Sequence, residues 1–240
     1  MEASAGSRAG ARRVPPATVV AVLVAAALVG VGAAVAGHAL LGGSSQPASQ
    51  VALGSRAALH VGGLQGEATW AAGVRPAPPI TTLTDQNGSN FSLASLHGRT
   101  VAIEFFDSHC TQECPLAGRA LAASERSLPA AKRPVLVVVS VNPKDTPASA
   151  RAAARKWGLA GLAPWHWLMG THAQLAPVWR AYHIQVRPTK SDIEHTEALF
   201  LLDRHGYERS GYLYPYAPAN VAHDLRLLAH GTAAGAIRGA

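Results

Sequence analysis

The two cysteines of this 240-residue chain stand four positions apart, in the segment Asp107-Ser-His-Cys110-Thr-Gln-Glu-Cys114-Pro115. Two soft thiolates so spaced can bind one soft metal ion, or can oxidise to a disulfide bond after a modest rearrangement. A purely structural disulfide would add little stability, because closing so short a loop removes only about 2 kcal/mol of chain entropy. The pair therefore indicates a redox or a metal-binding role.

The elements that flank the cysteines explain how such a site would be positioned. Val101–Phe106 is a continuous apolar run, typical of a strand buried on both faces, and the spacing of apolar residues predicts a helix over Pro115–Leu128. Ligand sites in open α/β sheets favour the carboxyl ends of strands, and a helix N-terminus lowers the pKa of a thiol. If the helix begins near Cys110, both sulfurs lie on one face about one turn apart.

The rest of the domain continues this alternation of strands and helices. Upstream, Ile80–Leu83 and Asn90–Leu93 flank the turn signal DQNG, which indicates an added N-terminal β-hairpin. The whole pattern is that of an α/β domain with a mixed central sheet and helices on both faces. The predicted elements are a strand over Pro134–Val141, a helix over Pro147–Trp157 capped by Asp145 or Thr146, a strand over Trp165–Met169, a helix over Thr171–Tyr182, a hairpin of Glu197–Leu202 and Tyr207–Tyr212, and a helix over Ala219–Ala229.

A long uncharged segment, Ala17–Leu41, precedes the domain. As a helix it is long enough to cross the ~30 Å core of a bilayer, so we predict one transmembrane helix. Arg8, Arg12 and Arg13 lie before it, and the next basic residue is Arg56. The positive-inside rule then makes this a single-pass protein of the cytoplasmic membrane, with its C-terminal domain on the extracytoplasmic side. A cleaved signal peptide is the alternative, although the apolar core of a signal peptide spans only about 7–15 residues.

We expect five regions in the chain. Residues 42–77 are rich in Gly, Ser, Ala and Pro and indicate a tether, and the last ten residues are mostly small. The regions are a cytoplasmic N-terminus (1–16), a transmembrane anchor (17–41), a tether (42–77), a globular domain (78–230) and a flexible tail (231–240).

Composition and charge exclude several classes of protein. With 48% hydrophobic and 15% charged residues, the chain is too apolar to be disordered. Two cysteines rule out a disulfide-dense scaffold and a four-cysteine zinc site. The formal charge of +7 comes from scattered basic residues without a dense basic run, so we expect no nucleic-acid binding.

Three segments occur in an order known from one family. FFDSHCTQECP carries a C-x₃-C-P signature, SVNPKDTPASARAAARKWG carries a strand, a turn with Asp-Thr-Pro and a helix, and IEHTEALFLLDRHGYE carries a histidine before an apolar strand and an Asp-x-x-Gly turn. Together they resemble the SCO (SCO/SenC) copper chaperones, over about Pro78 to Leu228. The resemblance implies a thioredoxin-like fold and a role in cytochrome c oxidase assembly.

The resemblance also implies that Cys110, Cys114 and His195 bind copper. Two thiolates and one imidazole suit Cu(I), and they suit Cu(II) when an oxygen or nitrogen ligand is added. In thioredoxin-like proteins a cis-proline normally faces the cysteine pair. Here Glu194-His195-Thr196 takes that place, so we expect the imidazole to face the sulfurs instead.

The chain departs from the family pattern at two places. Thr111 stands where the family commonly has proline after the first cysteine. The loop Asn142-Pro-Lys-Asp145-Thr-Pro is one residue shorter than its family counterpart and lacks the first aspartate. Neither change removes a ligand, but both bear on metal affinity and on surface contacts of the loop.

The other histidines and the nearby acidic residues are secondary candidates. His109 adjoins Cys110, but a residue at a helix start usually points away from its neighbour's side chain. No other histidine shows a partner at a metal-binding spacing, and we expect surface or core roles for His60, His97, His166, His172, His183, His205, His223 and His230. Five acidic residues near the site in sequence are interpreted as solvated charges, as a docking rim, or as groups that orient His195: Asp107, Glu113, Asp192, Glu194 and Glu197.

The leading hypothesis is a membrane-anchored metallochaperone that holds one copper ion and delivers it to the binuclear copper site of cytochrome c oxidase subunit II. The alternative is an enzyme, a thiol-disulfide oxidoreductase that keeps the target cysteines reduced through Cys110 and Cys114. A peroxidase is disfavoured, because Asp107 stands where an activating threonine is required. A copper-responsive signalling or storage module is a further possibility.

Overall fold

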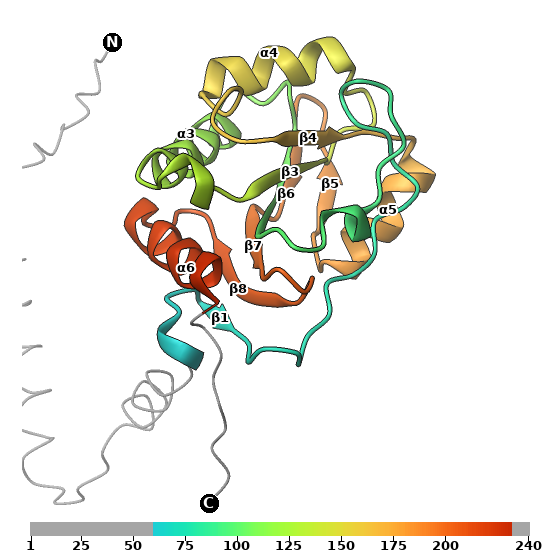
Figure 1. Ribbon diagram of the computed structural model, residues 1–240. Helices are drawn as coiled ribbons and strands as arrows, with labels where there is room; N and C mark the ends of the chain where they lie inside the picture. Colours follow the sequence, from blue (N-terminus) through green and yellow to red (C-terminus); the bar gives the residue numbers. More distant parts are fainter. Residues whose placement is uncertain (1–59, 232–240) are drawn as a thin grey trace, which may run out of the picture. The chain divides into compact units, whose positions relative to one another are not determined.

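A six-stranded mixed sheet runs through the part of the chain that the computed structural model describes, residues 60–231 (Figure 1). Its strand order is β1-β8-β7-β2-β3-β4. Strands β2, β3 and β4 are parallel, whereas β7 pairs antiparallel with β2, β8 with β7, and β1 with β8. The strands are β1 (Ala68–Thr69), β2 (Val101–Phe106), β3 (Val135–Ser140), β4 (Trp165–Leu168), β7 (Ala198–Leu202) and β8 (Glu208–Leu213).

Four α-helices cover the sheet, and a separate two-stranded ribbon lies beside it. The ribbon pairs β5 (Val186–Pro188) with β6 (Ile193–His195) in antiparallel register. The α-helices are α3 (Glu113–Arg126), α4 (Pro147–Trp157), α5 (His172–Ala181) and α6 (Pro218–His230), and three short 3₁₀ helices are η1 (Val61–Gly63), η2 (Leu93–Leu96) and η3 (Ala130–Lys132).

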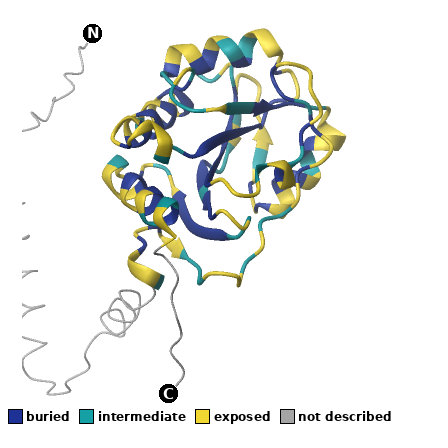
Figure 2. Ribbon diagram, viewed as in Figure 1, coloured by how far each residue is buried: buried dark blue, intermediate teal, exposed yellow. Residues whose placement is uncertain are grey.

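Two hydrophobic cores form because the central strands are buried on both faces. Every residue of β2 and β3 is buried, as the continuous apolar runs predict (Figure 2). Ala102 and Phe106 of β2 pack in the core beneath α3, α4 and α6. Ile103 and Phe105 alternate with them and pack in the core beneath α5. The mixed sheet with helices on both faces is the architecture that the sequence predicts.

The helices begin where their capping residues allow. Thr146, and not Asp145, is the N-cap of α4: its hydroxyl accepts the backbone N–H of Ser149, while the Ser149 hydroxyl accepts the N–H of Thr146. Pro147 occupies the first helical position, where a missing N–H costs nothing. Asp145 is thereby left for another role, described with the site below.

The predicted N-terminal hairpin forms its turn and its backbone hydrogen bonds, but without regular strands. Thr84 forms single bridges to Asn90 and to Met169, and no regular strand forms on either side of the turn. The turn is closed by Asp85, whose carboxylate accepts the N–H groups of Asn87 and Ser89. Backbone hydrogen bonds run from Phe91 to Leu83 and from Leu93 to Ile80, and the chain then forms η2 with Leu93 packed in the core beneath α5.

The folded part of the chain also begins earlier than the expected boundary at residue 78. Leu64 is fully buried in the core beneath α3 and α6, although a tether was predicted there. Ala68 and Thr69 form β1, which pairs with Gly211 and Ser210 at the edge of the sheet. The sequence did not reveal this segment, because two residues of strand give no periodicity.

Within residues 60–231, no helix has the length and apolar character needed to cross a membrane. The predicted anchor over 17–41, the first part of the tether and nearly all of the predicted tail lie outside the described residues.

The burial of Leu64 gives a direct test of the earlier boundary. Leu64→Ala should lower the free energy of unfolding by about 3 kcal/mol, because it leaves a cavity in the core. Val74→Ala, at a side chain that is 66% exposed in the same segment, should change it by less than about 0.5 kcal/mol. Urea unfolding followed by tryptophan fluorescence measures both. Equal effects of the two substitutions would place the segment outside the core.

Candidate metal centre

Cys110 lies in the loop between β2 and α3. The helix begins at Glu113, later than a start near Cys110, and its N-cap residue Gln112 makes no side-chain capping bond. The Cys110 sulfur instead accepts a hydrogen bond from the Cys114 thiol and the backbone N–H groups of Gln112, Glu113 and Cys114. These donors outweigh burial and lower the pKa of Cys110 to about 6.

Cys114 lies in the first turn of α3 and is fully buried. Its hydrogen bond to Cys110 and its burial raise the pKa of this thiol well above the usual range. Both cysteines are free thiols in the structure. The pair therefore holds one proton between two sulfurs near neutral pH, and a metal ion that bound both would displace it.

His195 ends β6 and faces Cys114 across the site. The two atoms nearest each other, His195 Nε2 and Cys114 Sγ, are 3.5 Å apart. His195 Nδ1 lies 3.2 Å from the carbonyl oxygen of Thr196, which can only accept, so Nδ1 carries the proton and Nε2 presents its lone pair to the sulfur. Burial lowers the pKa of His195, which keeps the imidazole neutral.

The ribbon of β5 and β6 holds this imidazole in place. Val186 pairs with His195, and the N–H of Thr196 donates to the carbonyl of Gln185 at 2.9 Å. The sequence does not predict this ribbon, because each of its strands is only three residues long. The structure therefore brings Cys110, Cys114 and His195 to one site from two distant segments.

An acidic cleft opens over the site. Cys110 and His195 line it together with Glu113, Asp192 and Glu197, and Glu194 also contributes. Glu194 is engaged by an exposed ion pair with Arg187 at the rim. Four of the five acidic residues singled out from the sequence therefore surround the site in space, and Asp107 does not line the cleft.

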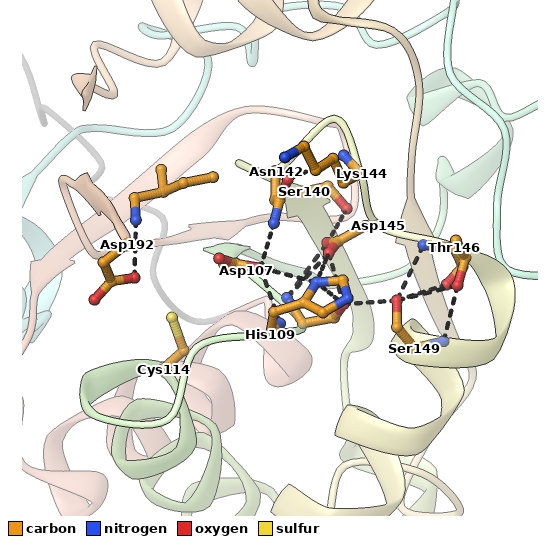
Figure 3. A network of polar contacts seen from close by, with 12 residues as sticks. Asp107, His109, Cys114, Ser140, Asn142, Lys144, Asp145, Thr146, Ser149 and Asp192 are labelled. Atoms are coloured by element: carbon orange, nitrogen blue, oxygen red, sulfur yellow. Dashed lines mark hydrogen bonds and ion pairs between the residues drawn. The ribbon is translucent and has the colours of Figure 1, made fainter. Parts of the chain in front are cut away.

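Asp107 and His109 belong to a separate polar network (Figure 3). His109 Nδ1 lies 3.2 Å from Asp145 Oδ1, and the backbone N–H of His109 donates to Asp107. The ring is thus directed toward these carboxylates, and the donor atoms of the three residues lie within 4.8 Å of one another as a cluster distinct from Cys114 and His195. The labelled Cys114 in Figure 3 stands apart from this network.

Asp145 is the residue that fixes the cysteine loop to the sheet. Its carboxylate accepts the Ser108 hydroxyl at 2.6 Å and the Ser140 hydroxyl at 2.7 Å. Trp167 Nε1 donates to the same carboxylate at 3.3 Å. Because Ser108 precedes Cys110 by two residues and Ser140 ends β3, these bonds tie the loop to the neighbouring strand. The sequence predicts Asp145 as a candidate helix cap and as part of the family's Asp-Thr-Pro turn, but not as this tie.

Glu104 is a buried acid that the sequence reasoning missed. It lies in the middle of β2 with no exposed surface, and Tyr216 donates its hydroxyl to Oε2 at 3.1 Å. Burial, together with the neighbouring Glu197 carboxylate, raises the pKa of Glu104 to about 8. A lone acid inside the apolar run VAIEFF is the signal that could have found it.

The mixed sheet, its flanking helices and the cysteine pair at the start of α3 define a thioredoxin-like domain with a dithiol–imidazole site. The family description SCO1/SenC matches residues 81–230, more than half of the sequence. The chain therefore belongs to the SCO1/SenC family. The comparison with curated proteins found no match.

Solved structures of Sco proteins share the fold. The copper-bound ScoI of Bradyrhizobium japonicum is 28% identical with a TM-score of 0.53, and the match covers 64% of this chain and 99% of that one. Copper-bound yeast Sco1 is 19% identical with a TM-score of 0.54, over 63% and 87% of the two chains. BsSco, a cytochrome c oxidase assembly protein with a disulfide switch, is 20% identical with a TM-score of 0.56, over 65% and 94%.

The hydrogen bonds to the Cys110 sulfur predict its reactivity. Its alkylation by iodoacetamide should reach half of the maximal rate near pH 6, because the thiolate forms above that pKa. Cys114→Ala removes the thiol donor and should move the midpoint upward. Mass spectrometry of timed samples measures both. A Cys110 midpoint near the ordinary thiol value of about 8.5 in the parent would contradict the assigned hydrogen bonds.

Proposed function

We propose that this protein is a membrane-anchored copper chaperone that binds one copper ion through Cys110, Cys114 and His195. It would deliver the ion to the binuclear copper site of cytochrome c oxidase subunit II. The observation that carries the proposal is the 3.5 Å approach of an unprotonated imidazole nitrogen to a sulfur of the cysteine pair. Family membership and the copper-bound ScoI support the choice of metal.

The donor set fits a copper ion in both size and chemistry. Metal–sulfur and metal–nitrogen bonds of about 2.3 and 2.0 Å at a tetrahedral angle place the two ligand atoms about 3.5 Å apart. His195 Nε2 and Cys114 Sγ already have this separation. Thiolate and imidazole ligands together select a soft or borderline ion such as copper.

Transfer would proceed by exchange of ligands. Incoming thiolates of the acceptor replace Cys110, Cys114 and His195 one at a time, so that copper is never released into water. Cys110 lies at the open cleft and is half-buried, whereas Cys114 is buried, so the acceptor meets Cys110 first. The acidic residues around the cleft suit an acceptor surface of positive charge.

A thiol-disulfide oxidoreductase is the second candidate, and one observation favours it. The pKa of Cys110 is lowered to about 6 beside a protonated partner thiol, which is the arrangement that attacks a disulfide of a target. The electrons would come from the dithiol, which becomes a disulfide as the target's disulfide becomes two thiols. Copper binding and exchange use the same sulfurs, so the two activities exclude each other in one molecule.

Replacing His195 separates the two candidates. In the full-length chain purified in detergent, His195→Ala should lose tight binding of Cu(I) by at least about a hundredfold, because one of three ligands is gone. Its dithiol should still reduce a model disulfide. Copper stoichiometry and X-ray absorption of the anaerobically loaded protein measure the loss.

His205→Ala, at an exposed histidine in the turn between β7 and β8, is the matched control and should bind copper as the parent does. Unchanged copper affinity in His195→Ala, with lost reductase activity, would favour the oxidoreductase.

The membrane anchor is tested by the mature protein in its own cell. If residues 17–41 stay as an anchor, the protein should sediment with membranes after carbonate washing, with its N-terminal segment intact by mass spectrometry. A mature chain that begins near residue 38 would instead indicate a cleaved signal peptide.

A further inference from the structure

Glu197 is buried within the site and is not exposed at its rim. It precedes β7, two positions after His195, and only 7% of its side chain is exposed. Its Oε1 lies 3.9 Å from His195 Nε2, and the donor atoms of Cys114, His195 and Glu197 all lie within 4.8 Å of one another. Its Oε2 is buried without a hydrogen-bond partner among the described residues. A carboxylate oxygen left so in a protein interior is costly unless a ligand meets it.

Glu197 approaches Nε2 of His195, the imidazole nitrogen that would bind the metal. A carboxylate that orients a metal-binding histidine bonds the nitrogen on the far side of the ring. In this site that nitrogen, Nδ1, is already bonded to the carbonyl of Thr196. Glu197 therefore occupies the position of a ligand and not that of an orienting group.

Two carboxyl groups, those of Glu104 and Glu197, lie close to each other at the site. Burial, and then repulsion from the nearby Glu197 carboxylate, raises the pKa of the fully buried Glu104, and the Tyr216 hydroxyl donates to Glu104 Oε2. Within the described residues, neither Lys nor Arg acts on either carboxyl group. Neither carboxyl group has a basic partner in this part of the chain, so a bound cation would stabilise their ionised forms.

We propose that Glu197 supplies a fourth, oxygen ligand to the metal and thereby favours Cu(II) over Cu(I). The inference rests on the copper site proposed above. Ligand oxygen and nitrogen atoms around one ion at about 2.0 Å lie about 3.3 Å apart at a tetrahedral angle, so Glu197 Oε1 needs to move about half an ångström. Cu(I) is satisfied by two sulfurs and one imidazole, whereas Cu(II) takes an additional hard donor. Glu197 is thus a determinant of the oxidation state that the site holds.

Two variants of the full-length chain in detergent test this ligand. Glu197→Gln is nearly isosteric and removes the charge from the site. Glu194→Gln is the matched control, since Glu194 lines the same cleft but is exposed and paired with Arg187. Each protein is titrated with a Cu(II) salt and, anaerobically, with Cu(I) in competition with a chromophoric chelator. Electron paramagnetic resonance and the sulfur-to-copper absorption band report the Cu(II) ligands.

We expect Glu197→Gln to lose at least about tenfold in Cu(II) affinity, with a changed hyperfine splitting, and to keep its Cu(I) affinity. Such a tenfold loss corresponds to a rise of about 60 mV in the potential of the bound copper. Retained Cu(I) binding also shows that the variant is folded around its three ligands. Glu194→Gln should match the parent in every measurement.

The outcomes separate the two proposals. If Glu197→Gln keeps the Cu(II) affinity and the resonance spectrum of the parent, the oxygen ligand is wrong and the three-ligand copper site stands. An equal loss for both variants would show a general effect of charge and would equally overturn the ligand. If the parent binds neither form of copper tightly, the proposed function itself fails.

Discussion

The chemistry of this protein depends on one contact, the approach of His195 Nε2 to Cys114 Sγ between segments that lie 81 residues apart. Each partner is fixed by its own local structure. The Thr196 carbonyl sets the tautomer of the imidazole, and the β5–β6 ribbon sets its position. The loop before Cys114 is tied to β3 through Asp145. A change in either support would leave all three donor residues present but would separate them.

Negative charge is the second constraint on the site. A thiolate at Cys110 and four acidic residues line one cleft, and the buried carboxyl group of Glu104 lies near one of them, Glu197. The backbone N–H groups at the start of α3 stabilise the thiolate, whereas the Tyr216 hydroxyl donates to Glu104 and no basic side chain among the described residues acts on either buried acid. Such a site favours the binding of a cation and disfavours the binding of an anion. Metal binding and thiol exchange would draw on the same sulfur, since both need Cys110 deprotonated.

Much of the fold could be predicted because its central elements carry strong local signals. The apolar runs of β2 and β3 and the Thr146-Pro147 start of α4 follow from burial and capping chemistry. The ribbon that carries His195, the edge strand β1 and the packing of Leu64 could not be predicted in this way. These pieces are too short to show periodicity, and they are ordered by what they pack against. The upstream hairpin is predicted from its turn, and it forms with backbone hydrogen bonds across that turn but without regular strands.

The sequence by itself determined the chemical types at the site: two thiols at a spacing of four, one histidine in a family segment, and several acids nearby. Residue type and local spacing are enough for that, because they set donor softness and the position of a helix start. Only the tertiary structure decided which acid enters the site. Glu197 and Glu194 are both close to His195 in sequence, yet one is buried beside the sulfur and the other is exposed in an ion pair. The difference arises because β7 enters the sheet immediately after Glu197, which carries that side chain inward while the ribbon keeps Glu194 at the surface.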